Sequence, residues 1–257
     1  MEKYPILEVC VDSLASACAA IQGGADRLEL CAALAVGGLT PYTALLEQIR
    51  NESSIPVRCL MRPRGGDFLY TPEEIRMMAA QIRELRAAGA DGFVIGCLTR
   101  DGNLDKEAMA PLVEAAAGAG LTLHRCIDVS RDPVEVYFDA KELGIDTILT
   151  SGAASNCTAG KEMIGKLIRA WKEHGGPRIM PGAGVNAKVI TAFLNEFPEL
   201  ECFHASCKTE IESGMLFRRD GVPMGLPGLD EWHIQQTSAD AVAAAKAALT
   251  GGKSHEQ

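Results

Sequence analysis

Eight short apolar runs rich in β-forming residues alternate with eight longer, Ala-rich helical stretches along this chain of 257 residues. The predicted strands are residues 6–11, 27–31, 57–61, 92–95, 121–125, 147–149, 178–180 and 202–205. The predicted helices are residues 13–22, 42–51, 72–88, 106–117, 133–143, 161–173, 187–196 and a last one near 239–249. Each strand-and-helix unit takes about 32 residues, the size of a right-handed parallel crossover. The alternation therefore predicts an α/β fold, a single (β/α)8 TIM-like barrel over residues 1–250.

A weak repeat supports this regularity. Residues 24–26, 89–91 and 144–146 each read Gly-x-Asp and lie between a predicted helix and the next strand. Glycine after a helix adopts the left-handed conformation without strain, and Asp suits the short turn that follows. A doubly wound open sheet is the alternative fold, but no GxGxxG follows the first strand, so a nucleotide cofactor is not expected either.

Composition narrows the class of protein. The net charge of −9 and the lack of a basic run argue against a nucleic-acid partner. No run of 18 apolar residues occurs, and the first residues lead directly into a strand, so we expect a cytoplasmic protein without a membrane partner. The nine cysteines are spread singly and include no CxxC pair, which fits reduced thiols rather than disulfides or structural zinc.

Two segments depart from the repeat. Residues 207–237 form a predicted long loop after strand eight, and loops of this length commonly act as a lid, a binding loop or an oligomer arm. Its position after a strand places it on the face where barrel enzymes carry their chemistry. Residues 251–257 are polar and are predicted to be a flexible tail.

Charged residues lie within or directly after the predicted strands. Glu8 and Glu29 interrupt neighbouring apolar strands, where we expect them at similar depth. A buried carboxylate needs a partner, and Arg62, Arg64 and Arg125 are the natural cations. Two interpretations stay open: a structural layer of ion pairs, or a site for an anionic or polar substrate in which one carboxylate acts as acid or base.

The predicted catalytic set combines these charges with neighbouring strand ends. His124 could share the acid–base role or be a structural, hydrogen-bonded histidine. The full set is Glu8, Glu29, Arg62, His124, Arg125 and Asp128.

A glycine turn after the seventh strand indicates an anion site. Gly182 and Gly184 precede Asn186, a predicted helix N-cap, and such a turn exposes backbone N–H groups as a phosphate cradle does. These glycines can also be plain turn residues. The predicted anion-binding residues are Arg64, Ser151, Gly182, Gly184 and Ser206.

Two cysteines indicate a candidate metal-binding site. Glu8 and Cys10 share an E-x-C spacing with Glu29 and Cys31, so alternation places each pair on one face of its strand. If the two registers match, Cys10 and Cys31 lie about 5 Å apart and could hold a soft ion such as Cu(I). The alternative is two buried cysteines that act as small hydrophobic residues.

Six segments together resemble the CutC family. They are LEVCVD at 7–12, GGADRLELC at 23–31, MRPRGGDFLY at 61–70, LTSG at 149–152, MPGAG at 180–184 and HAS at 204–206. The resemblance runs from about residue 6 to the last helix. It implies a TIM-like barrel, a homodimer or homotetramer, a cytoplasmic role in copper homeostasis, and Cu(I) bound at Cys10 and Cys31.

Two classes of function follow. In the first, the protein binds copper ions through its thiolates. In the second, it is a barrel enzyme that acts on a small phosphorylated or carboxylated metabolite. We predict copper homeostasis and keep the enzyme acting on a small anionic metabolite as the alternative.

Overall fold

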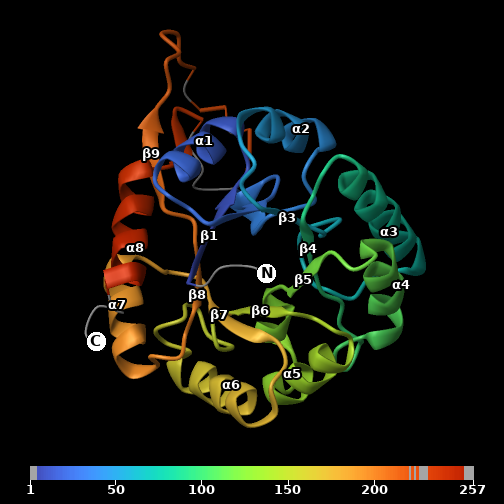
Figure 1. Cartoon of the computed structure of the whole chain (residues 1–257). Coiled ribbons are helices and arrows are strands. Elements are labelled where there is room, and N and C mark those ends of the chain that lie inside the picture. Colours follow the sequence, from blue (N-terminus) through green and yellow to red (C-terminus); the bar gives the residue numbers. More distant parts are fainter. Residues whose placement is uncertain (1–4, 220, 223, 226–230, 252–257) are drawn as a thin grey trace.

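The computed structural model describes residues 5–219, 221–222, 224–225 and 231–251, and its strands form an almost closed parallel barrel (Figure 1). The strands are β1 (Ile6–Val11), β2 (Arg27–Leu30), β3 (Val57–Leu60), β4 (Gly92–Ile95), β5 (Gly120–Leu123), β6 (Thr147–Thr150), β7 (Arg178–Pro181) and β8 (Cys202–Ala205). They pair in the order β7-β6-β5-β4-β3-β2-β1-β8, and β7 and β8 lie side by side. The predicted (β/α)8 barrel is confirmed and the open doubly wound sheet is excluded.

The helices surround the barrel as a ring (Figure 1). They are α1 (Leu14–Gln22), α2 (Thr43–Glu52), α3 (Pro72–Ala87), α4 (Lys106–Ala116), α5 (Pro133–Glu142), α6 (Lys161–His174), α7 (Ala187–Glu196) and α8 (Ala239–Gly251). All eight predicted helices are confirmed with small shifts at their ends. The predicted N-cap Asn186 is also confirmed, since its side chain accepts a hydrogen bond from the N–H of Val189.

Alternation along the strands separates the main core from the barrel interior. In β1, Leu7 and Val9 point outward and belong to the large hydrophobic core between the strands and the helices. Glu8 and Cys10 point inward. Both are buried, so this strand carries its polar chemistry inside the barrel.

The Gly-x-Asp repeat has a structural role at the amino ends of the barrel strands, opposite the carboxyl ends. The three glycines have positive φ, as the predicted turns require. Each aspartate accepts a hydrogen bond from the first or second backbone N–H of a neighbouring strand. The pairs are Asp26 with Leu7, Asp91 with Val57 and Asp146 with Leu121.

The register between β1 and β2 differs from the expected one. Glu8 lies opposite Arg27, and Cys10 lies opposite Glu29. The expectation that Glu8 and Glu29 sit at similar depth is therefore wrong, because the strands are offset by two residues. Cys31 follows the end of β2 and donates its backbone N–H to the carbonyl of Val11, so it is not level with Cys10 either.

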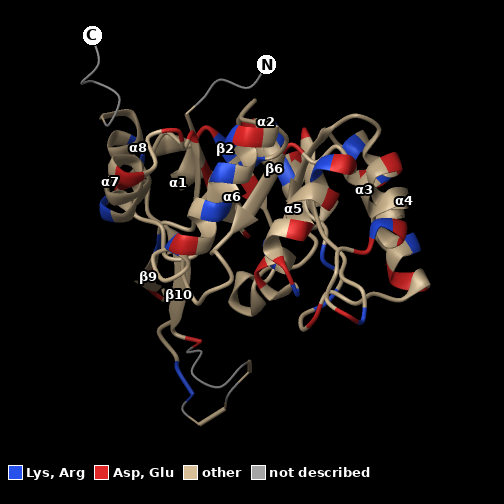
Figure 2. Cartoon of the chain, turned by 90° about the horizontal axis from the view of Figure 1, so that it is seen from below, with Lys and Arg blue, Asp and Glu red and all other residues tan. Residues whose placement is uncertain are grey.

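The predicted long loop contains an antiparallel hairpin. Within residues 207–237, β9 (Lys208–Glu212) pairs with β10 (His233–Thr237). β9 follows β8 closely, so the hairpin extends beyond the carboxyl ends of the strands, and Figure 2 shows it projecting from the barrel. Of the predicted tail, only Gly251 is described and it ends α8; residues 252–257 lie outside the described residues.

Acidic and basic residues are interspersed along the visible helices (Figure 2). Over the described residues, no helix has both the length and the apolar character needed to cross a bilayer.

Candidate functional site

A cavity of about 440 Å³ opens among the carboxyl ends of the strands. Many of the lining residues fall in or directly after strand ends, as expected for a site in a parallel barrel. The lining residues are Cys10, Glu29, Leu34, Gly37, Leu60, Arg62, Phe68, His124, Arg125, Asp128, Val129, Leu149, Ala183, Gly184, Val185, His204 and Ser206.

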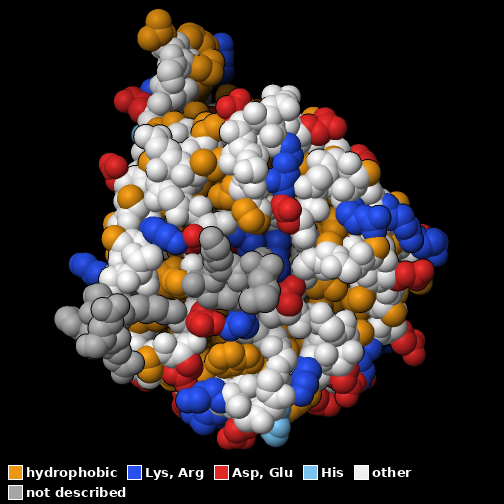
Figure 3. Space-filling model, viewed as in Figure 1, with side chains coloured by type: hydrophobic (Ala, Val, Ile, Leu, Met, Phe, Trp, Pro, Cys, Tyr) orange, Lys and Arg blue, Asp and Glu red, His pale blue; other side chains and the backbone are white. Residues whose placement is uncertain are grey.

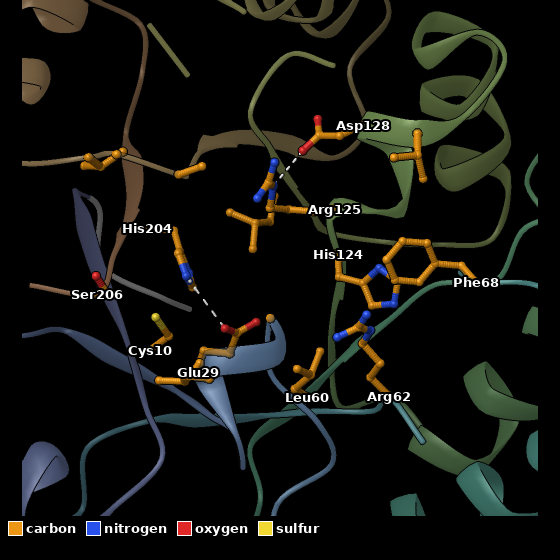
Figure 4. A pocket seen from close by; sticks show the side chains of 17 residues that line it. Cys10, Glu29, Leu60, Arg62, Phe68, His124, Arg125, Asp128, His204 and Ser206 are labelled. Atoms are coloured by element: carbon orange, nitrogen blue, oxygen red, sulfur yellow. Dashed lines mark hydrogen bonds and ion pairs between the residues drawn. The ribbon is translucent and has the colours of Figure 1, made fainter. Parts of the chain in front are cut away.

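One wall of the cavity gathers three groups that can ligate a metal ion. Donor atoms of Cys10, Glu29 and His204 all lie within 4.8 Å of one another, and all three residues are buried. They come from β1, β2 and β8, which are neighbours in the barrel. Figure 4 shows the three side chains pointing toward one another. We call these three residues the donor cluster.

Glu8 lies behind the donor cluster and holds His204 in place. Its carboxylate lies 2.9 Å from His204 Nδ1 and accepts a 2.6 Å hydrogen bond from Arg27 Nε. Burial alone would raise the pKa of Glu8, but Arg27 and His204 outweigh burial and lower it to about 2. Glu8 is therefore an ionised carboxylate inside the barrel.

The pKa of Glu29 moves in the opposite direction. Burial is the largest cause and raises its pKa, and the neighbouring charge of Glu8 raises it further. Cys31 Sγ lies 3.5 Å from a carboxylate oxygen of Glu29. Burial also raises the pKa of the Cys31 thiol well above its ordinary value, and Glu29 adds to this shift.

The pKa of His204 is raised despite its burial. Burial lowers it, but Cys10, Glu29 and Glu8 outweigh burial and raise the pKa well above the ordinary value. His204 Nε2 faces the cavity side of the cluster, 3.7 Å from a Glu29 oxygen.

The opposite wall is cationic and aromatic. Arg62 follows β3 and is buried, and its guanidinium donates hydrogen bonds to three backbone carbonyls. Phe68 lies against it, with the ring centroid 5.4 Å from Arg62 Cζ. The carbonyl acceptors belong to Val36, Gly38 and Gly66.

His124 lies beside Arg62 on this wall. The predicted strand through residue 125 ends at Leu123, and His124 instead caps a 3-10 helix at Arg125–Val129. Its Nδ1 accepts a hydrogen bond from the N–H of Cys126, and its ring centroid lies 4.7 Å from that of Phe68. Burial, then the charge of Arg62, lowers the pKa of His124 to about 3.

Arg125 and Asp128 form a third group on the rim. Arg125 Nε donates to Asp128 at 2.7 Å, and its Nη2 donates to Ser151 Oγ. Asp128 also accepts hydrogen bonds from the backbone N–H and hydroxyl of Ser151 and from the Thr150 hydroxyl. These contacts fix the Asp128 carboxylate at the end of β6.

The structure places the predicted site residues in two groups. The residues that line the cavity are Cys10, Glu29, Arg62, His124, Arg125, Asp128, Gly184 and Ser206. The residues outside its lining are Glu8, Cys31, Arg64, Ser151 and Gly182. An anion site at the glycine turn stays a prediction.

The expected ion pairs were wrong. Within the described part of the chain, Glu8 pairs with Arg27, and neither Glu8 nor Glu29 forms an ion pair with Arg62, Arg64 or Arg125. Arg64 instead pairs with two carboxylates on the surface, those of Asp67 and Glu74.

Three residues of this region were missed from the sequence. Arg27 and His204 have the inward parity of their strands, which was the available signal. Phe68 lies in the segment after β3 and has no periodicity that would reveal it.

Comparisons with known proteins agree on one family. The CutC family profile matches residues 5–209. The chain is 41% identical over 220 residues to the human copper homeostasis protein cutC homolog, covering 86% of this chain and 80% of that protein. It is 40% identical to the family protein CutC of Chromobacterium violaceum, covering 95% of this chain and 98% of the relative. A solved CutC structure from Streptococcus agalactiae superposes with a TM-score of 0.73 at 28% identity, covering 78% of this chain and 98% of that one.

The low pKa of His124 predicts an acid-sensitive fold. The unfolded chain binds a proton at this histidine near pH 6.5, whereas the folded chain does not until about pH 3. Stability is therefore lost as the pH falls below 6.5. Between pH 7 and pH 5, the free energy of unfolding of the wild type should fall by about 2 kcal/mol more than that of His124→Gln. Urea unfolding at the two pH values measures the difference.

His174→Gln is the matched control, because His174 is exposed on α6. Between pH 7 and pH 5, the free energy of unfolding of His174→Gln should fall by as much as that of the wild type. An equal loss in His124→Gln and wild type would contradict the burial of a neutral imidazole at this position.

Proposed function

The chain belongs to the CutC family, and we propose on this basis that it serves copper homeostasis by binding Cu(I) at the donor cluster. The observation that carries the proposal is the convergence of Cys10, Glu29 and His204 within 4.8 Å at one wall of the cavity. The human relative of similar sequence is named as a copper homeostasis protein.

The chemistry of the cluster suits this ion. Thiolate sulfur is a preferred donor for Cu(I), and imidazole also suits copper. Glu8 accepts from one ring nitrogen of His204, which leaves Nε2 on the side of Cys10 and Glu29. Metal-bound histidines commonly have a carboxylate in this position, because it fixes the orientation of the ring.

Cys31 supplies a second thiol beside the cluster. It packs with Cys10 in one small buried group inside the barrel. Its raised pKa means that the free protein holds it as a thiol, so binding of Cu(I) there releases a proton. We therefore assign Cys10 and His204 as the primary ligands and Cys31 as the additional sulfur donor.

Replacement of single donors tests the proposal. Residues that only hydrogen-bond to a metal ligand are worth roughly 10–100-fold in metal affinity, so loss of the sulfur ligand itself in Cys10→Ser should weaken Cu(I) binding by at least ~100-fold. Cys31→Ser should weaken it less, and the double variant should bind no Cu(I) tightly. Anaerobic competition against a chromophoric Cu(I) chelator measures each affinity.

Cys202→Ser is the control. Cys202 is also buried inside the barrel, but it packs with Ile6, Leu149 and Met180, away from the donor cluster. The Cys202→Ser variant should bind Cu(I) with the affinity of the wild type. Wild-type affinity in the Cys10 and Cys31 double variant would rule out this site.

We also assign the protein to the cytoplasm. All nine cysteines are free thiols, and eight of them are buried or partly buried. Free thiols persist in a reducing compartment, which is also where Cu(I) is the stable copper ion to be handled.

The β9–β10 hairpin and the described residues between its two strands, which we call the hairpin arm, favour an oligomer. Seven of the thirteen exposed large hydrophobic side chains in the described chain belong to this arm, and Leu216 is fully exposed. Figure 3 shows hydrophobic side chains on the projecting arm. An apolar surface of this kind marks an interaction site, and we propose that a second copy of the chain covers it in a homodimer or homotetramer. The seven are Ile211, Met215, Leu216, Phe217, Val222, Met224 and Ile234.

Charges on the arm should dissociate this oligomer. Leu216→Glu combined with Phe217→Glu should convert it to a monomer, because each carboxylate would be buried without a partner. Light scattering after size-exclusion chromatography measures the mass. Met77→Glu, an exposed hydrophobic position on α3, should leave the mass unchanged. A wild-type protein that is already monomeric would refute the arm as an interface.

A further inference from the structure

Two buried donors on the cationic wall lack partners. Arg62 Nε and His124 Nε2 are buried, and neither has a hydrogen-bond partner among the described residues. Both side chains line the cavity. Buried polar groups in native proteins are nearly always hydrogen-bonded, so an orphaned pair at one cavity wall indicates a missing acceptor.

The charge of Arg62 is also uncompensated. Its three hydrogen bonds go to neutral backbone carbonyls, which fix the guanidinium without cancelling its charge. Among the described residues, no carboxylate lies within ion-pair distance of it. A buried cation is costly unless an anion approaches it, so the missing acceptor should carry negative charge.

His124 contributes a second donor without a second charge. Because Nδ1 accepts from the N–H of Cys126, the proton of the neutral ring resides on Nε2. The lowered pKa keeps this ring neutral at physiological pH. The wall therefore offers two N–H groups and a single positive charge.

We infer that Arg62 Nε and His124 Nε2 bind the carboxylate of a small organic monoanion inside the cavity. A planar carboxylate has one charge and two oxygens, which matches one cation and two donors. A phosphate dianion would have one negative charge without a cation and further oxygens without a donor at this wall. The apolar body of the ligand would contact Leu34, Leu60 and Val185, which line the same cavity.

The ring of Phe68 belongs to this site. It lies against both His124 and Arg62, as Figure 4 shows, and so shields the two donors from bulk water. Phe68 is only partly buried, and it must turn aside for a carboxylate to reach them. The donor cluster lies across the cavity, so the bound anion would face the copper site without sharing a ligand with it (Figure 4).

Benzoate and benzamide form a matched pair of probes, since they share shape but differ in charge. Benzoate should bind the copper-free wild-type protein at least tenfold more tightly than benzamide, as measured by calorimetry. Inorganic phosphate at equal concentration should not displace benzoate. Equal binding of the two probes, binding of neither at millimolar concentration, or displacement by phosphate would overturn the inference.

Variants assign the binding to the two donors. His124→Asn keeps an acceptor for Cys126 but removes the distal N–H, and it should weaken benzoate binding at least tenfold. His124→Gln restores a donor near the Nε2 position and should recover part of the affinity. Arg62→Met should remove binding, whereas Arg76→Met on the exposed face of α3 should not change it.

Cu(I) affinity provides the check on folding. Each of the four variants should bind Cu(I) as the wild type does, because none of the three substituted positions belongs to the donor cluster. If Arg62→Met unfolds, the two His124 variants and the comparison of benzoate with benzamide still test the carboxylate site. Unchanged benzoate affinity in His124→Asn would overturn the assignment.

Discussion

The buried ion pair between Glu8 and Arg27 is the interaction on which the barrel interior depends. Both side chains are almost completely buried, and they lie opposite each other in the β1–β2 register. Because both charges are buried, removing either partner should destabilise the fold by about 3–5 kcal/mol. The same carboxylate also contacts His204 Nδ1, so the pair that stabilises the interior also orients the imidazole of the donor cluster.

The cavity in front of this ion pair has two chemically distinct walls. β1, β2 and β8 contribute a thiol, a carboxylate and an imidazole. The segments after β3 and β5 contribute Arg62 and His124, whose Nε and Nε2 atoms are buried without a hydrogen-bond partner among the described residues. We therefore propose two binding sites in one cavity, one for a soft metal ion on the first wall and one for an organic anion on the second. Strand alternation turns the side chains of the donor cluster into the barrel, and the strand order places β1, β2 and β8 side by side on one wall.

Much of the fold was predictable because it depends on local patterns. Strand and helix periodicity, the Gly-x-Asp turns and the Asn186 cap are all readable along the chain. The register was not, since a two-residue offset between strands leaves the pattern of each strand unchanged, and this offset places Cys10 opposite Glu29. The contribution of His204 was missed for the same reason: the predicted barrel places the last strand beside the first, but only the register brings His204 level with Glu8.

X-ray absorption at the copper edge of the Cu(I)-loaded protein tests the central claim most directly, because it reports the identity of the atoms bound to the ion. The account predicts sulfur together with a histidine nitrogen in the first shell, and loss of the nitrogen signal in His204→Ala. A first shell without sulfur, or a spectrum that is unchanged in His204→Ala, would contradict a copper site built from Cys10 and His204.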